Sequence, residues 1–87
     1  MYTCPVCGYQ LLAVPPAAYS ICHCCGTEFE ADDVDFSHPE LTERWMRAGM
    51  PWFSRAVQPP PNWNPVQQLT NAGLVFRNSS LVTGLLK

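Results

Sequence analysis

The first third of the chain alternates short apolar runs with turn residues, a pattern typical of β structure. Residues 9–14 form one such run, Pro15-Pro16 predicts a turn, and residues 19–21 form the returning run. Residues 27–32 then alternate polar and apolar positions, which indicates a further strand with Phe29 facing the core. We therefore expect a β-hairpin in this part of the chain.

The hydrophobic period changes after residue 36 and predicts a helix from about His38 to Ala48. Ser37 is the expected N-cap, and Glu40 follows three residues later, as a capping box requires. Apolar residues at i, i+4 and i+7 spacing form the inward face, namely Leu41, Trp45 and Ala48. Gly49 and Pro51 end this helix.

A second, shorter helix is expected after Asn64-Pro65. Asparagine is a common N-cap, proline is common in the first turn, and Gly73 provides the end. Val66 and Leu69 are predicted to point inward. The fold class that follows is α+β: a small ribbon, built as a β-hairpin, followed by one or two short helices.

A chain of 87 residues is long enough for one domain. We expect this single domain, residues 1–87, to divide into a ribbon at 1–36, a helical extension at 37–73 and a C-terminal strand or tail at 74–87. That last segment is rich in apolar residues, so we expect it to pack on the domain, on a second copy as a homodimer, or on another protein.

Five cysteines give the ribbon its chemistry. Four of them form two Cys-x-x-Cys-Gly knuckles, Cys4 to Gly8 and Cys22 to Gly26, with fourteen residues between Cys7 and Cys22. Two residues between the sulfurs allow both to reach one ion, and the glycine permits a positive φ. The pattern predicts one structural Zn²⁺ held by four thiolates, Cys4, Cys7, Cys22 and Cys25.

Several alternatives to this zinc site remain open. Four thiolates also bind iron, and Cys7-Gly8-Tyr9 is similar to a rubredoxin knuckle. Disulfides would need an oxidising compartment. His23 could replace one sulfur as a ligand. Cys24 is spare under the favoured assignment, either as an inert thiol or as a reactive one.

Charge is divided between the two halves of the chain. All seven acids lie in residues 1–43, and all five bases lie in residues 44–87. Because phosphate contacts need Lys and Arg, nucleic acid is a poor partner for the ribbon. The acidic stretch at 28–35 is either a solvated turn or a face for a protein partner, and it lacks the spacing of a known calcium loop.

The remaining features narrow the function further. His23 and His38 are the two histidines, and no nucleophile or acid–base pair is apparent, so we expect no enzyme activity. Neither a signal peptide nor a membrane-spanning run is visible, which predicts a cytoplasmic protein. Cytoplasmic thiols stay reduced, in agreement with a metal site.

The chain resembles a family of small bacterial cysteine-rich proteins, the CPCC-type zinc ribbons. The resemblance rests on Cys-Pro-Val-Cys-Gly-Tyr near the start, on Ile21-Cys22 with Cys25-Gly26 and Glu28-Phe29, on Asp32-Asp33 and on the later tryptophans. It implies a bacterial cytoplasmic protein and supplies no catalytic residues to carry over, and some similar small proteins act as immunity or accessory partners of toxins. The function expected is a protein-binding adaptor or immunity-type protein with a structural zinc; a nucleic-acid-binding ribbon or an iron electron carrier are the alternatives.

Overall fold

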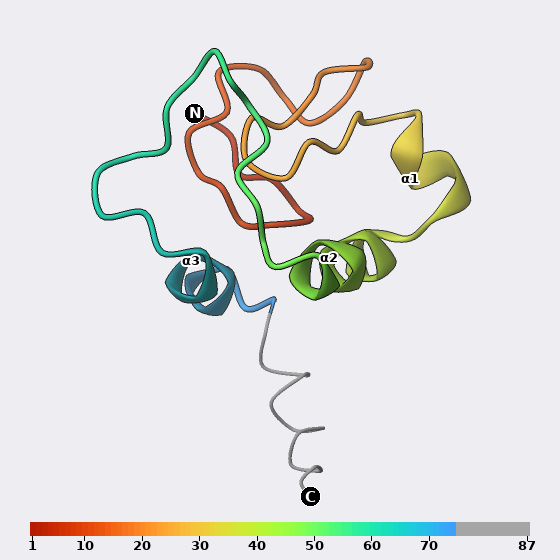
Figure 1. The fold of residues 1–87 in the computed structure, drawn as a ribbon. Helices are drawn as coiled ribbons and strands as arrows, with labels where there is room; N and C mark the ends of the chain where they lie inside the picture. Colours follow the sequence, from red (N-terminus) through yellow and green to blue (C-terminus); the bar gives the residue numbers. More distant parts are fainter. Residues whose placement is uncertain (75–87) are drawn as a thin grey trace, which may run out of the picture.

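The computed structural model describes residues 1–74, and within them the chain forms three short helices and no β-strand. The helices are α1 (Asp32–Asp35), α2 (His38–Arg47) and α3 (Pro65–Asn71), and loops connect them (Figure 1). The predicted α+β fold with a β-hairpin ribbon is therefore wrong. The described part is a small domain of loops and helices. The predicted strand or tail at 74–87 lies, except for Leu74, outside the described residues.

Two isolated β-bridges stand where the hairpin was expected. Tyr2 pairs with Leu12, and Ile21 pairs with Glu28, both antiparallel. Each bridge closes its own cysteine loop and does not join the two loops together. The connection between them cannot extend a ladder, because Pro15 and Pro16 lack an N–H and because Ala18 and Tyr19 have positive φ values of 52° and 64°.

The alternating segment 27–32 does not form a strand either. Its backbone turns at Glu30, where φ is 71°, and Asp32 N–H donates to the carbonyl of Glu28 at 2.8 Å. Two acids of α1 stabilise this turn: the Asp32 carboxylate accepts from the N–H of Glu28, and Asp33 accepts from the N–H of Glu30. Such local acceptors compete with strand pairing, and periodicity does not reveal them. Phe29 is nevertheless buried, as predicted.

Helix α2 begins as the sequence indicates. The Ser37 hydroxyl accepts from the N–H of Glu40, and the Glu40 carboxylate accepts from the N–H of Ser37. This confirms the capping box. Trp45 is buried on the inner face, but Ala48 is the exposed C-cap, so its predicted inward position is wrong. The helix ends a residue early, which places Ala48 after its last turn.

Helix α3 also has its predicted cap, because the Asn64 side chain accepts from the N–H of Gln67. Leu69 is fully buried, as expected. Val66 is 51% exposed, which contradicts its predicted inward position. A helix of two turns buries only a narrow stripe of its surface, and in α3 Leu69 occupies that stripe.

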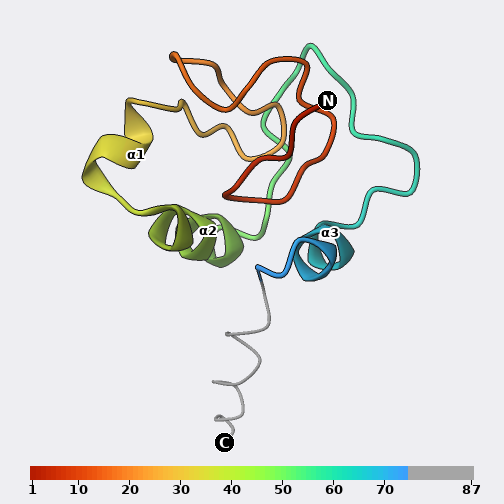
Figure 2. The same ribbon diagram turned by 180° about the vertical axis from the view of Figure 1, so that it is seen from behind.

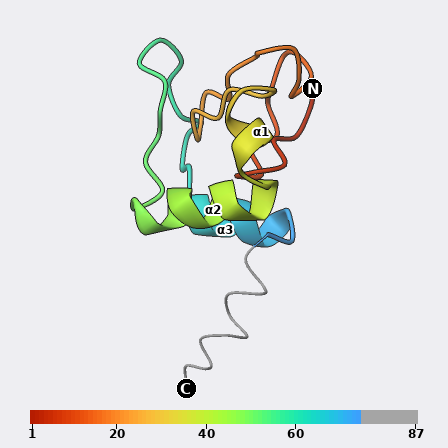
Figure 3. The ribbon, with the colours of Figure 1, turned by 90° about the vertical axis from the view of Figure 1, so that its right-hand side faces the viewer.

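Helices α2 and α3 lie on the same side of the loop layer formed by residues 1–31 (Figure 1), and the view from behind shows the same arrangement (Figure 2). From the side, the loops sit above the two helices, and the segment that leaves α2 rises along the layer before returning to α3 (Figure 3). The cysteine loops thus form the centre on which both helices pack.

Aromatic side chains join the loops to the returning segment. Trp52 makes edge-to-face contacts with Tyr9 on one side, at a centroid distance of 5.4 Å, and with Trp63 on the other, at 5.2 Å. Such pairs contribute about 0.5–1.5 kcal/mol each beyond their buried area. Trp45 packs in the core beside them. The tryptophans therefore attach the second half of the chain to the cysteine loops.

Within residues 1–74, the three helices are all too short to cross a membrane.

Candidate metal centre

The structure brings together the four cysteines that the knuckle pattern singled out. The sulfurs of Cys4, Cys7, Cys22 and Cys25 all lie within 4.8 Å of one another. Cys4 Sγ is 3.8 Å from Cys25 Sγ, and Cys7 Sγ is 3.7 Å from Cys22 Sγ. Among the described residues, these four are all free thiols, so the structure shows no disulfide between them.

Each knuckle is built by the same set of hydrogen bonds. In the first, Cys4 N–H donates to Tyr9 O at 2.8 Å, and Gly8 N–H donates to Cys4 O at 2.9 Å. In the second, Cys22 N–H donates to Thr27 O at 3.0 Å, and Gly26 N–H donates to Cys22 O at 2.9 Å. These bonds fold each Cys-x-x-Cys segment back on itself, so that its two sulfurs point to one place.

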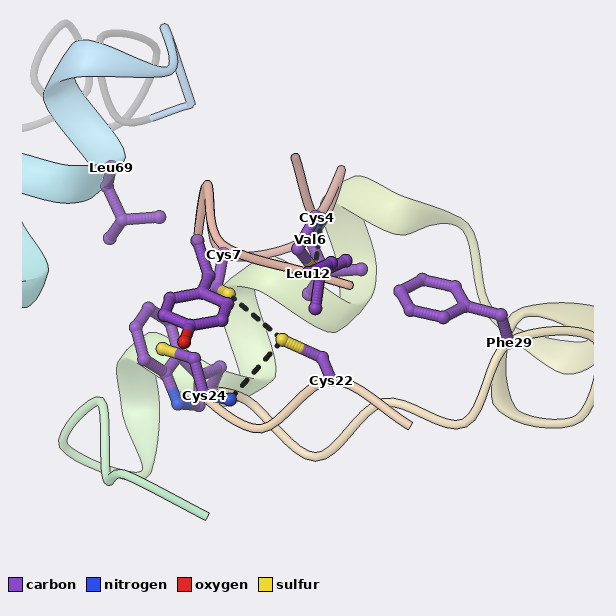
Figure 4. Close-up of a cluster of buried hydrophobic side chains, with 10 residues drawn as sticks. Cys4, Val6, Cys7, Leu12, Cys22, Cys24, Phe29 and Leu69 are labelled. Atoms are coloured by element: carbon purple, nitrogen blue, oxygen red, sulfur yellow. Dashed lines mark hydrogen bonds between the residues drawn. The ribbon is translucent and has the colours of Figure 1, made fainter. Parts of the chain in front are cut away.

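Backbone N–H groups also point at the sulfurs. Val6 N–H donates to Cys4 Sγ, and Cys24 N–H donates to Cys22 Sγ, each at 3.4 Å. Figure 4 shows Cys22 Sγ between the sulfur of Cys7 and the backbone nitrogen of Cys24. Donors in these positions stabilise negative charge on sulfur, which a thiolate ligand carries.

The two knuckle glycines are required by backbone conformation and by space. Gly8 has a φ of +86°, and a Cβ there would lie 2.8 Å from the Cβ of Ala72. Gly26 has a φ of +81°, and a Cβ there would lie 2.5 Å from the ring of Phe53. Each knuckle is thus covered closely by a later segment: the first by α3, the second by the chain around Phe53.

Electrostatics within the cluster favour charge on Cys22. Hydrogen bonding with Cys25, and then with Cys4 and Cys7, lowers the pKa of the Cys22 thiol far below its ordinary value. Hydrogen bonding with Cys22 raises the pKa of Cys7, and it is also the main cause of the raised pKa of Cys4. Four thiols this close cannot all ionise unless a cation compensates them.

Two of the sulfur pairs have the separation expected in a tetrahedral metal site. Four sulfurs that each lie about 2.3 Å from one ion are separated by about 3.8 Å. The Cys4–Cys25 and Cys7–Cys22 sulfur pairs, at 3.8 and 3.7 Å, match this edge. Cys4, Cys7 and Cys22 are fully buried, and Cys25 is partly buried beside the Thr27 hydroxyl at 3.2 Å. The cluster can hold one metal ion with all four positions filled by protein.

The other residues considered from the sequence do not join this cluster. His23 is not among the grouped ligands, so the described residues do not support a Cys₃His site. Asp32 and Asp33 direct carboxylate oxygens to backbone N–H groups of the preceding turn. His38 lies 3.0 Å from an oxygen of Asp33 and packs edge-on against Phe29. No second ligand group occurs in residues 1–74.

Cys24 is buried completely and is held by α3. The side-chain amide of Gln68 donates to Cys24 Sγ at 3.4 Å and to the carbonyl of Cys7 at 2.9 Å. Gln68 accepts in turn from the indole N–H of Trp63 at 3.0 Å. The Gln68 side chain therefore contacts both knuckles and Trp63. The sequence reasoning missed Gln68, because a lone polar helix residue carries no signal of a partner far away in the chain.

Helix α2 makes a second link of this kind. The buried hydroxyl of Thr42 lies within hydrogen-bond distance of two carbonyls, that of Val6 in the first knuckle and that of His38 in its own helix. The sequence reasoning also missed Thr42, which lies between the predicted apolar positions. A polar residue on the inner stripe of an amphipathic helix is the signal that could have identified it.

Comparison with known proteins places the cysteine segment in a family. No curated protein matches the chain, and no solved structure does. The match to the family described as Cysteine-rich CPCC extends over residues 2–44 and so covers all four clustered thiols. Residues 2–44 therefore match the Cysteine-rich CPCC family, whereas the later tryptophans that also entered the sequence resemblance lie outside the matched segment.

Proposed function

We propose that the protein is a small zinc-binding scaffold whose structural Zn²⁺ is held by Cys4, Cys7, Cys22 and Cys25, and whose function is to bind another protein. The observation that carries the metal part is the cluster of four sulfurs within 4.8 Å of one another, two pairs of which are separated by the length of a tetrahedral edge. Because all four positions are filled by protein, the ion has no open position for a substrate, and its role is structural. We propose no catalytic role.

A metal ion supplies what this small domain otherwise lacks. Four of the ten buried apolar residues within residues 1–74 are cysteines, and three of these belong to the cluster. Structural zinc in small domains contributes about 10–16 kcal/mol of apparent binding free energy, and this free energy stabilises the fold. A cytoplasmic location, where thiols stay reduced, suits such a site.

The first experiment is a native mass spectrum of the full chain, purified under reducing conditions, together with its visible absorption. We expect one zinc per chain and a colourless protein. A red protein that contains one iron would contradict the zinc assignment and support the rubredoxin-like iron site. A metal-free mass reduced by the hydrogens of paired thiols would contradict the metal centre altogether.

The protein-binding part is supported by the segment at residues 28–36. Helix α1 buries none of its residues, and its Val34 is 73% exposed. Acidic side chains flank this apolar residue, including the exposed Glu30 and Asp35. An exposed apolar residue within an acidic rim favours a protein partner with a basic rim of its own.

The arginines of α2 support nucleic-acid binding less well than α1 supports protein binding. The guanidinium of Arg44 lies 4.4 Å above the ring of Phe36, and Arg47 lies 3.6 Å from Glu43. Both are thus engaged within the domain, and the cysteine loops have no Lys or Arg. Phosphate binding needs several unengaged cations on one surface.

Partner binding can be tested with variants of α1. The tagged protein would be used to capture partners from the cells that produce it, in parallel for the parent, for Val34→Ser with Asp35→Lys, and for the control Val66→Ser, an exposed valine on α3. We expect one protein to bind stoichiometrically to the parent and the control, with at least a tenfold loss for the α1 variant. Equal capture by all three, or no stoichiometric partner, would contradict the proposal.

A further inference from the structure

A groove of about 310 Å³ lies between the first knuckle and the start of α3. Residues 8–11 form one wall, and residues 60–64 with the outer face of α3 form the other. The two walls come from opposite ends of the described chain. The groove lies apart from α1, so a ligand here would be independent of the partner proposed above.

Carboxamide side chains dominate the polar part of this groove. Gln67 donates to Asn71 at 2.9 Å along α3, which leaves the Gln67 oxygen and the Asn71 amino group available. Among the described residues, the exposed side chains of Gln10 and Asn62 have no hydrogen-bond partner. Each carboxamide offers both donors and an acceptor at one position.

An aromatic side chain with a fixed orientation lines the same groove. Trp63 is partly exposed, its indole N–H donates to Gln68 at 3.0 Å, and its ring meets Trp52 edge to face. Because these contacts hold the indole in place, a ligand would meet a prepared apolar face and would not have to order it.

The groove has no formal charge. None of the described residues that line it is Asp, Glu, Lys, Arg or His, and the one titratable side chain, Tyr9, is nearly buried. A phosphate, a carboxylate or a metal ion would find no counter-charge there. A ligand that suits this groove would be neutral and would carry both donors and acceptors to satisfy the carboxamides.

From this combination we propose that the groove binds a neutral sugar residue. A sugar ring carries hydroxyls, which donate and accept as carboxamides do, and it has an apolar face of C–H groups for the indole. The volume, near the lower end of the range of about 300–1,000 Å³ for small-molecule pockets, suits one or two rings. An extended peptide fits less well, because within residues 1–74 no strand offers an edge for it to pair with.

The test uses the zinc-loaded full chain and amide NMR spectra. The probes are the methyl glycosides of glucose, galactose, mannose and N-acetylglucosamine, each titrated to about 100 mM, with acetyl-trialanine-amide as the neutral peptide probe. We expect at least one glycoside to shift signals of residues 8–11 and 60–71 in a saturable manner. The Trp63 indole N–H and the Gln68 side-chain amide give internal readouts next to the knuckles.

Matched variants locate the binding site. Gln67→Ala with Asn71→Ala removes two exposed carboxamides of the groove, and Gln58→Ala removes an exposed one outside it. We expect the dissociation constant to rise about tenfold or more in the first and to stay unchanged in the second. No saturable shift with any glycoside, equal binding by the double variant, or shifts produced by the peptide alone would each overturn the proposal.

Discussion

The side chain of Gln68 on α3 donates a hydrogen bond of 2.9 Å to the backbone carbonyl of Cys7, sixty-one residues earlier in the chain. Beside it, a Cβ at Gly8 would lie only 2.9 Å from the Gln68 carbonyl oxygen. The first knuckle and α3 are therefore in close backbone contact, and the knuckle glycine makes that contact sterically possible. The sulfur cluster is thus covered on the side of the first knuckle by a helix that lies outside the segment that matches the family.

Replacement of Gln68 measures this link. Gln68→Ala leaves the carbonyl of Cys7 and the indole N–H of Trp63 without their partners, so we expect the free energy of unfolding to fall by about 2 kcal/mol. Gln67→Ala is the control, since its side chain is exposed and bonded only to Asn71; its effect should stay within about 0.5 kcal/mol. Urea unfolding of the zinc-loaded proteins gives both values. Equal losses in the two variants would mean that the link contributes nothing.

The two adjacent cysteines of the second knuckle should respond differently to replacement. Cys25 belongs to the sulfur cluster, whereas Cys24 lies against Gln68 outside it. We expect Cys25→Ala to lose stoichiometric metal binding, because three thiolates and an open position remain. Cys24→Ala should keep one ion per chain and lose only some stability through the cavity it creates. Metal content measured by native mass spectrometry distinguishes them, and loss of metal from Cys24→Ala would contradict the ligand set.

The close packing of Phe53 on the second knuckle can be tested by a substitution at Gly26. Gly26→Ala forces a side chain into the left-handed region and towards the ring of Phe53, so we expect a loss of about 3 kcal/mol. Gly49→Ala is the control, since its φ is +96° but nothing lies within 4 Å of its Cβ, and it should lose about 1 kcal/mol.

Phe53→Ala in the Gly26→Ala background separates the two causes of this loss. Removal of the ring should restore the part of the stability that the clash costs, as measured by a double-mutant cycle of unfolding free energies. A coupling free energy near zero would show that the ring does not close the knuckle.

Asp33 provides a prediction about pH. Its hydrogen bond to His38, and then that from the N–H of Glu30, hold the pKa of this carboxyl below its ordinary value of 3.8. Because the pKa of Asp33 is lower in the folded than in the unfolded state, its carboxylate stabilises the fold at pH values above the unfolded pKa, and this contribution is lost as the pH falls through the folded pKa. Acid also releases metal from thiolates, so overall stability would mix the two effects.

The measurement is therefore a direct titration of the Asp33 carboxyl carbon by NMR. We expect its pKa to rise in His38→Ala, because the largest cause of the lowering is removed. The Glu40 carboxyl, whose pKa is lowered by the Ser37 N–H, serves as the internal control and should titrate alike in both proteins. An unchanged Asp33 titration would show that His38 does not set it.

The sequence predicted those features whose cause is local. The capping box at Ser37 and Glu40 and the Asn64 cap each involve residues within one helical turn, and both were confirmed. The four clustered cysteines were identified because two-residue spacing fixes where a pair of sulfurs can point. The two caps and the pairing of sulfurs within each knuckle join residues only a few positions apart, whereas the contact between the two knuckles spans 15 and 21 residues.

The features that were wrong or missed depend on contacts over longer distances or on side chains that compete for the backbone. The strand predicted at 27–32 gave way to a turn in which Asp32 and Asp33 accept from backbone N–H groups. Val66 was placed inward by its apolar character, yet α3 offers the core only Leu69. Gln68 was missed since its partners are set by how α3 meets the knuckles, which no local pattern encodes.

The position of the four clustered cysteines has a consequence for how the chain is made. All four lie within the first 25 residues, whereas the groups that cover them, at Phe53 and Gln68, come much later. A growing chain therefore presents a complete set of thiols while its second half is still untranslated. Metal capture during synthesis would close two short loops first and give α3 a finished surface on which to dock. We expect the knuckles to stay open to metal exchange and to oxidants until the chain around Phe53 and α3 has emerged and can cover them.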